Sequence, residues 1–184
     1  EWGVAYKYLK ASLDNYDYLN AHSLTPHLML SHSDERLSLF KLQWRHEQYA
    51  YPNLDGYDGS RYHLTYRHLW LFGDKRYLSS GVEVGRDMTE DSELASQKYG
   101  INAAAQWDWQ KMESTFNLSY LQRAFPDALA ERSDKVLKAG VRLRYPLGVH
   151  SQLEATVNRI DNASDLPQYD YDRLVYGMTL KWKL

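Results

Sequence analysis

The chain has 184 residues, which fit one domain, and a formal net charge of −2. It contains no cysteine, which excludes a disulfide framework and a thiolate metal site. No apolar run approaches the ~20 residues that a membrane helix needs, and the mean hydropathy of −0.66 is that of a soluble protein. These values still allow a membrane protein whose strands are apolar only at every second position.

Apolar and polar residues alternate with a period of two along most of the chain, which is the period of a β-strand and not of a helix. Most alternating segments are near the ~9–11 residues with which a tilted strand crosses a bilayer. In chain order the sequence predicts ten strands, at residues 2–11, 20–31, 37–46, 60–71, 77–86, 99–109, 114–123, 135–145, 151–159 and 171–184.

The predicted connections alternate in length. Long ones cover residues 12–19, 47–59, 87–98, 124–134 and 160–170, and short ones cover residues 32–36, 72–76, 110–113 and 146–150. Short turns on one side and long loops on the other are typical of outer-membrane barrels. An interfacial aromatic girdle is expected at the short-turn strand ends, where the sequence places Trp2, Trp70, Trp109 and Trp182.

These patterns predict an all-β fold, a single domain over residues 1–184 that forms an antiparallel transmembrane β-barrel of about ten strands. The short turns would be periplasmic and the long loops extracellular. The alternative is a soluble antiparallel barrel or sandwich with the apolar face turned inward. Alternation alone does not separate the two.

The end of the chain adds a resemblance. Gly177, Leu180, Trp182 and Leu184 resemble the C-terminal targeting strand of bacterial outer-membrane proteins, although the usual last residue is phenylalanine. Residues 162–173 resemble the last outer loop of barrels that follow periplasmic tetratricopeptide repeats, such as surface-lipoprotein assembly modifiers and polysaccharide exporters. The resemblance implies a Gram-negative outer membrane. It also implies contact with membrane lipid, lipopolysaccharide and the barrel-assembly machinery, and a periplasmic repeat domain or surface lipoprotein as partner. Strands or a domain would then precede Glu1.

Charges separate strongly between loops and strands. The long connections hold fifteen acidic residues but only two basic ones, Lys98 and Arg132. Cations facing lipid would each cost roughly 2–4 kcal/mol at the midplane, so we expect the basic strand residues to face inward. Twelve basic residues occupy strand positions that alternate onto the inner face, namely Lys7, Lys41, Arg45, Arg61, Arg67, Arg123, Lys138, Arg142, Arg144, Arg173, Lys181 and Lys183. Only Glu83, Asp108 and Glu154 are expected to oppose them there.

A basic inner face favours transport or export of an anionic solute, an anionic polymer or a surface lipoprotein. The same cations could instead fill a plugged barrel, because about eight strands leave room only for side chains. Such a barrel would be structural or adhesive and would act through its outer loops, of which residues 47–59 are rich in tyrosine. Tyrosine offers large contact area at low entropy cost.

A third hypothesis is an outer-membrane hydrolase. His32 and Ser33 resemble the histidine–serine pair of outer-membrane lipid-modifying barrels, but adjacent strand residues point to opposite faces. Asp55, Asp58 and His63 resemble residues of outer-membrane aspartyl proteases, yet this segment is also a good turn sequence. We therefore predict a protein that is not an enzyme, with no cofactor, no metal site and no nucleic-acid partner.

Overall fold

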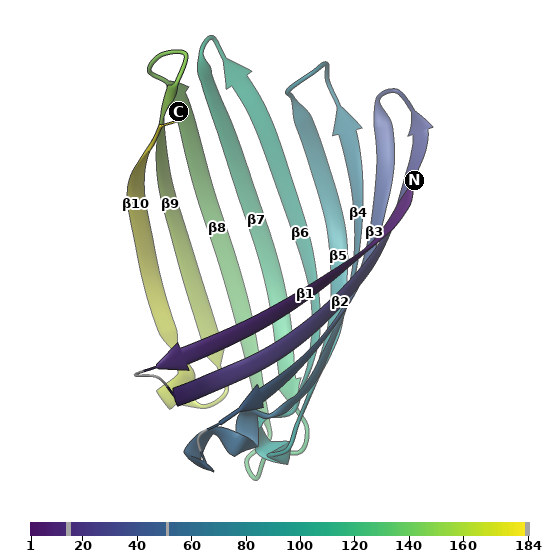
Figure 1. Ribbon diagram of the computed structural model, residues 1–184, viewed down its shortest axis with the longest axis vertical. Helices are drawn as coiled ribbons and strands as arrows, with labels where there is room; N and C mark the ends of the chain where they lie inside the picture. The colour runs from purple at the N-terminus through teal and green to yellow at the C-terminus, as the bar shows by residue number, and fades with distance from the viewer. Residues whose placement is uncertain (14–15, 51, 183–184) are drawn as a thin grey trace.

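The computed structural model describes residues 1–13, 16–50 and 52–182. They form one antiparallel sheet of ten strands in which each strand pairs with its neighbours in sequence, from β1 to β10 (Figure 1). The ten predicted strands are thereby confirmed. The strands are β1 (Trp2–Leu13), β2 (Tyr16–Ser33), β3 (Arg36–Tyr49), β4 (Gly59–Leu71), β5 (Tyr77–Thr89), β6 (Ser96–Trp109), β7 (Met112–Phe125), β8 (Arg132–Pro146), β9 (Ser151–Ser164) and β10 (Tyr171–Trp182).

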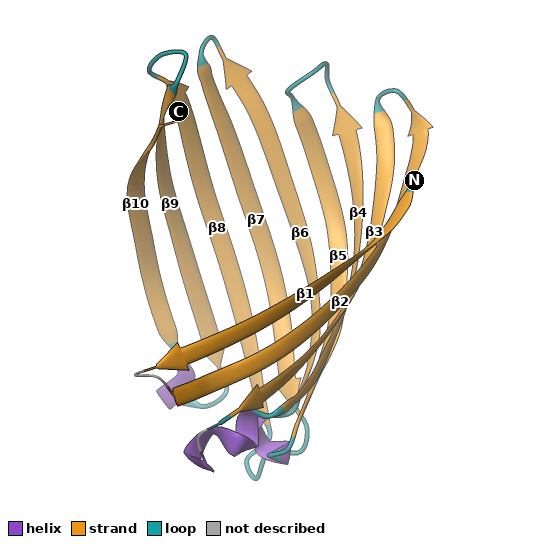
Figure 2. Ribbon diagram, in the orientation of Figure 1, coloured by secondary structure: helices purple, strands orange, loops and turns teal. Residues whose placement is uncertain are grey.

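Helical structure within the described ranges is limited to three short 3-10 turns (Figure 2). They are η1 (Pro52–Tyr57), η2 (Ser92–Leu94) and η3 (Pro167–Tyr169), and each lies in a connection that the sequence predicts to be long. Among the described residues, no helix is long and apolar enough to cross a membrane.

The connections differ between the two ends of the sheet, as Figure 1 shows. At the short-turn end they cover residues 34–35, 72–76, 110–111 and 147–150, and β1 begins and β10 ends at this end, at Trp2 and Trp182. Two of these turns use the left-handed region of backbone space, at Gly73 (φ 77°) and Gln110 (φ 55°). At the long-connection end, the described parts of the connections cover residues 50, 52–58, 90–95, 126–131 and 165–170.

The long connections are shorter than the sequence predicts, because the strands continue beyond the expected boundaries. β3 runs to Tyr49, β5 to Thr89 and β9 to Ser164, and β6 and β8 begin three residues early. Residues 12–19, expected to form a loop, belong largely to β1 and β2, and residues 14–15 lie outside the described part of the chain. The acidic residues in these extensions are typical of turns in sequence, but in the structure Glu47 and Asp87 pair with cations of neighbouring strands and Asp134 pairs with Arg132 of its own strand.

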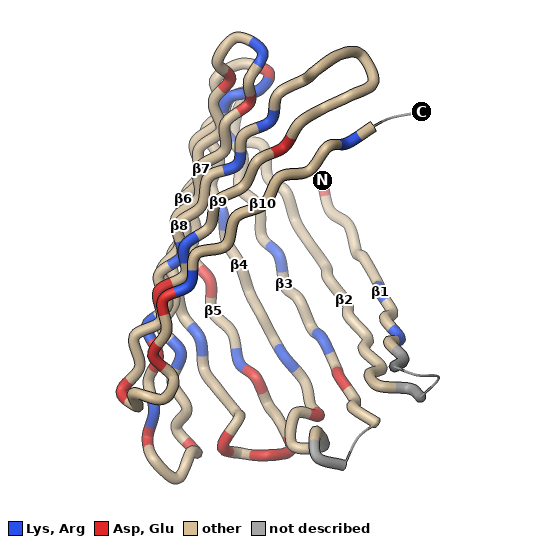
Figure 3. Tube along the Cα trace, turned by 90° about the vertical axis from the view of Figure 1, so that its left-hand side faces the viewer, with Lys and Arg blue, Asp and Glu red and all other residues tan. Residues whose placement is uncertain are grey.

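The sheet curls into a trough and does not close (Figures 1 and 3). β1 pairs with β2 and β10 pairs with β9, and no register joins β1 to β10 among the described residues. The expected closed barrel is therefore not present in this structure. The two edge strands lie apart across the open side of the trough.

The sheet is a single layer with almost no apolar core. Within the described ranges, only Leu19, Ala21, Phe125 and Val136 are buried hydrophobic residues. Most large apolar side chains are exposed, with Met178 at 75% as an example. They gather on the convex face, because residues paired across strands project to the same side. The register Phe40–Tyr66–Val82–Ile101 illustrates such an apolar row.

Candidate functional site

The concave face carries the basic residues that the sequence singles out. Their register partners connect from strand to strand, as in Arg45–Arg61–Asp87, so they share one face. Figure 3 shows basic positions along the strands and many acidic positions at the long-connection end. The concave row positions are Lys7, Lys41, Arg45, Arg61, Arg67, Arg123, Lys138, Arg142, Arg144, Arg173 and Lys181. Lys183 lies outside the described residues.

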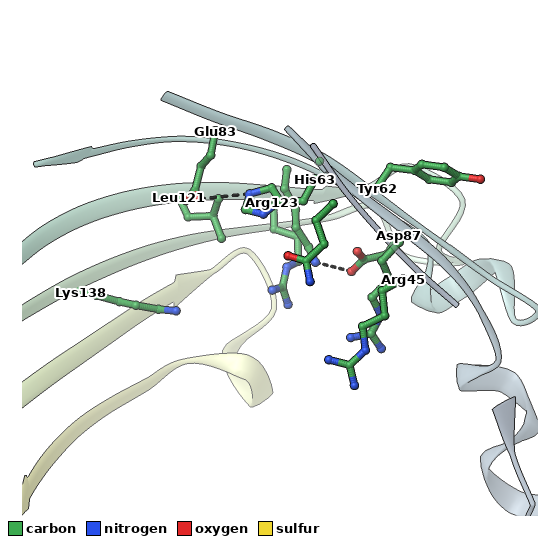
Figure 4. Close-up of a pocket in the computed structure, with 12 residues that line it drawn as sticks. Arg45, Tyr62, His63, Glu83, Asp87, Leu121, Arg123 and Lys138 are labelled. Carbon is green, nitrogen blue, oxygen red and sulfur yellow. Dashed lines mark hydrogen bonds and ion pairs between the residues drawn. The ribbon is translucent and has the colours of Figure 1, made fainter. Parts of the chain in front are cut away.

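Five cations converge on a pocket of about 330 Å³ in this face, which we call the basic pocket. Its lining cations are Arg45 on β3, Arg61 on β4, Lys98 on β6, Arg123 on β7 and Lys138 on β8. Figure 4 shows Arg45, Arg123 and Lys138 on the hollow side of the sheet, with the ring of Tyr62 away from them. Gly85 also lines the pocket and leaves room between the longer side chains.

Lys98 was expected in a loop, but the structure places it inside the basic pocket. It lies between Gly85 and Arg123 in register, because β6 begins at Ser96. Its ammonium group pairs with the carboxylate of Asp87, which also accepts a hydrogen bond from Ser96 Oγ at 3.2 Å. Continued alternation ahead of the predicted strand is the sequence signal that could have located Lys98.

A buried carboxylate holds the two arginines at the mouth of the pocket. Glu47 is 3% exposed, and its two oxygens lie 2.5 Å from Arg45 Nη2 and 2.7 Å from Arg61 Nη2. Burial of a carboxylate is costly unless it is paired, so Glu47 fixes these guanidinium groups. The sequence assigned Glu47 to a loop and did not anticipate this role.

The remaining pocket cations have no such partner. Arg123 and Lys138 form no ion pair with a described carboxylate, and Arg123 Nε is buried without a hydrogen-bond partner in the described structure. Glu83, which was expected to oppose cations, pairs with His63 Nε2 at 3.2 Å. Five cations thus face three carboxylates, counting Glu47, and two positive charges are in excess at this site.

A different arrangement occupies the concave face near the short-turn end. Arg144 Nη1 lies 2.7 Å from Glu113, and Arg144 Nε lies 3.0 Å from Glu154. Glu154 also contacts Lys181 Nζ at 2.9 Å. Two cations and two carboxylates balance in this group, which we call the Arg144 cluster. Asp108 was expected to oppose cations, but it lies opposite Glu113, and its Oδ1 is buried without a partner in the described structure.

A third group of interacting side chains lies at the long-connection end of the sheet. Arg132 donates three hydrogen bonds to Asp134, and its guanidinium group lies 3.8 Å from the Phe125 ring centroid and 3.7 Å from that of Tyr169. Ser164 Oγ donates to Asp134 at 2.6 Å. The sequence expected Arg132 and Asp134 in a loop, yet both belong to β8.

Five more predicted cations line the face without a carboxylate. They have no ion pair within the described part of the chain and are Lys7, Lys41, Arg67, Arg142 and Arg173. Arg67 Nε is buried without a hydrogen-bond partner there. Small residues separate Arg67 from Lys138 along one row, namely Gly81, Asn102 and Ser119. Unneutralised charge thus extends beyond the basic pocket.

The structure does not assemble the suspected catalytic groups. His32 Nε2 contacts Ser38 Oγ at 2.9 Å, whereas Ser33 Oγ accepts a hydrogen bond from the Glu35 backbone. Asp58 accepts from the Tyr49 backbone N–H at 2.6 Å, and His63 binds Glu83. The side chain of Asp55 is outside the described structure.

The residues that resemble a targeting strand lie on β10. Gly177 is on the concave face opposite Thr156, and Leu180 and Trp182 are exposed on the convex face. Leu184 is outside the described residues. Comparisons with known protein families, with curated proteins and with solved structures found no match.

Proposed function

We propose that the chain forms a β-barrel in the outer membrane of a Gram-negative bacterium. The observation that carries this proposal is the bare apolar convex face of a single-layer sheet, with charge gathered on the concave face. A sheet normally buries its apolar face against another layer. A lipid bilayer would provide that cover. Trp2, Trp70, Trp109 and Trp182 all lie at the short-turn end, where they would form an interfacial girdle.

Closure of the barrel is part of the proposal. Ten strands in a meander leave β1 and β10 antiparallel to each other, which is the relation that edge pairing requires. Each unpaired backbone group costs several kcal/mol in hydrocarbon. Within a bilayer, the edge strands would therefore pair with each other or with further strands.

We propose further that the barrel transports or exports an anionic solute or polymer. The excess charge of the basic pocket and the carboxylate-free Arg67, Arg142 and Arg173 support this function. Cations in a confined space with low-dielectric walls add their potentials and concentrate anions. A surface lipoprotein or a periplasmic repeat domain would be the partner in an export role.

A plugged, non-enzymatic barrel is the second candidate, and the Arg144 cluster favours it. Its charges neutralise one another across β7, β8, β9 and β10. Such a network holds strands together without any solute. Function would then lie in the long connections, which would face outward and meet lipopolysaccharide.

Planar-bilayer recording separates the two candidates. We expect conductance with anion selectivity, and we expect Arg123→Gln combined with Lys138→Gln to shift the reversal potential toward cations. The matched control is Lys75→Gln combined with Lys111→Gln, which removes equal charge from the short turns. Absence of conductance would favour the plugged barrel, and an equal shift in both variants would contradict a role for the basic pocket.

Orientation has its own test. Single cysteines at residue 92, in a long connection, and at residue 74, in a short turn, would be treated on intact cells with an impermeant thiol reagent. We expect labelling at residue 92 alone. Labelling at residue 74 alone would reverse the proposed orientation.

A further inference from the structure

A polar recess lies on the convex face close to the short-turn end. It is formed by His32 on β2, Arg36 and Ser38 on β3, and Tyr66 and His68 on β4, and we call it the polar notch. These three strands are neighbours in the sheet (Figure 1). The recess measures about 360 Å³, and its other lining residues are the apolar Leu30 and Phe40.

Ser38 organises the notch. Its Oγ lies 2.9 Å from His32 Nε2, 3.0 Å from His68 Nδ1 and 3.4 Å from the Tyr66 hydroxyl. The two imidazole rings stack at a centroid distance of 5.7 Å. A hydroxyl has a single proton, so Ser38 donates to only one imidazole and the other must donate to Ser38. The three side chains therefore hold one another in place.

This arrangement leaves hydrogen-bond donors free. When both rings are neutral and Ser38 donates to one of them, that ring carries its proton on the opposite nitrogen, and this N–H has no partner among Ser38, His32 and His68. Arg36 adds a guanidinium group with no ion pair or hydrogen bond within the described part of the chain. Among the described residues, no carboxylate lines the notch. Its chemistry therefore suits an anionic ligand that only accepts hydrogen bonds.

Hydrolysis by Ser38 does not fit this geometry. Ser38 is 3% exposed, and two imidazoles and a phenol surround its oxygen. A nucleophile needs an open path to the reacting carbonyl carbon. The notch consequently has the features of a binding site rather than of a serine hydrolase.

We propose that the polar notch binds the phosphate group of a phospholipid in the leaflet at the short-turn end. This inference rests on the proposed membrane location of the convex face. Arginine is well suited to phosphate because its donors match two phosphate oxygens at once. Leu30 and Phe40 would contact the acyl chains. Trp70, whose ring lies 4.6 Å from that of His68, would mark the level of the headgroups.

Native mass spectrometry of the full chain released from detergent tests the proposal. With phosphatidylglycerol present, we expect one lipid to be retained per chain, and Arg36→Gln to weaken retention about tenfold, as for a charged hydrogen bond. Lys75→Gln, which removes a cation from the adjacent short turn, should retain the lipid. Diacylglycerol with the same acyl chains should not be retained.

The proposal would be overturned if Arg36→Gln retained as much phosphatidylglycerol as the unmodified chain does. It would also be overturned if the unmodified chain retained diacylglycerol as well as it retains phosphatidylglycerol. Binding of inorganic phosphate with the affinity of phosphatidylglycerol would overturn it in favour of a free-phosphate site. If Arg36→Gln does not fold, the double variant His32→Phe with His68→Phe decides, because it removes whichever imidazole holds the free N–H but keeps both aromatic rings. Resistance to alkaline extraction from vesicles is measured in parallel. A chain that resists extraction but retains no lipid contradicts only this site, whereas a chain that is extracted contradicts the membrane location.

Discussion

The concave face of the sheet carries charged side chains and the convex face carries apolar ones, and two neighbouring residues on β3 show this contrast. Lys41 belongs to the concave face, where charged side chains contact one another across strands, and Leu42 belongs to the convex face, where it is exposed. A soluble sheet has the reverse requirement for its apolar side. The comparison teaches that alternation defines two faces but not their environments. The difference between the faces is that most ion pairs of the described residues lie on the concave face, whereas the exposed apolar side chains of the convex face have no covering layer there.

The largest expected effect comes from exchanging the character of the two faces. Leu42→Arg or Val141→Arg should destabilise the folded protein in vesicles by roughly 2–4 kcal/mol, because each places a cation in hydrocarbon. Lys41→Leu, one residue away, should cost less. Urea unfolding in vesicles, followed by tryptophan fluorescence, measures both. If Lys41→Leu lowered the stability strongly and Leu42→Arg left it unchanged, the concave face would be the buried side of a soluble protein.

A smaller effect should divide the concave face itself. Arg144→Gln should destabilise by about 1–3 kcal/mol, between the values for buried and exposed ion pairs, because Arg144 is 33% exposed and serves both Glu113 and Glu154. Arg142→Gln, two residues away on the same face, lacks an ion-paired carboxylate in the described structure and should change stability by no more than ~0.5 kcal/mol. The same unfolding experiment tests this pair, and equal losses would show that the Arg144 cluster is not a structural clamp.

The smallest effect is expected for the ion pair on the convex face. Arg159 Nη2 lies 2.7 Å from Asp172, and the two side chains are 61% and 55% exposed. Asp172 is the second residue of β10, close to the long-connection end. There we expect water rather than hydrocarbon, so Arg159→Gln should cost less than ~1 kcal/mol. A loss as large as that of Leu42→Arg would place this pair deep in the bilayer.

The strands and the division of their residues between two faces could be predicted from the sequence, because the alternation with a period of two does not depend on what the strand contacts. The strand ends were not. Glu47, Asp87 and Asp134 have the composition of loops, and their place in strands depends on the cations that they meet on neighbouring strands or nearby. Carboxylates at a strand end indicate a loop only when no cation lies within reach.

The sites depend even more on contacts across the sheet. The basic pocket combines residues from β3 to β8, and the polar notch joins His32 to a serine six residues away and to His68 two strands on. Parity identified which cations share a face. It did not show which of them are neutralised, because Arg144 and Arg142 have the same parity and differ only in their neighbours.

The meander has a consequence for the order of folding. Every strand pair in the sheet joins neighbours in sequence, so each hairpin can form and extend the sheet without waiting for a distant segment, and the loops to be closed are short. Contacts of this kind favour fast folding. Joining β1 to β10 would be the exception, because it closes a loop of nearly the whole chain. We therefore expect hydrogen exchange during refolding to protect the central hairpins first, and the outer amides of the two edge strands last.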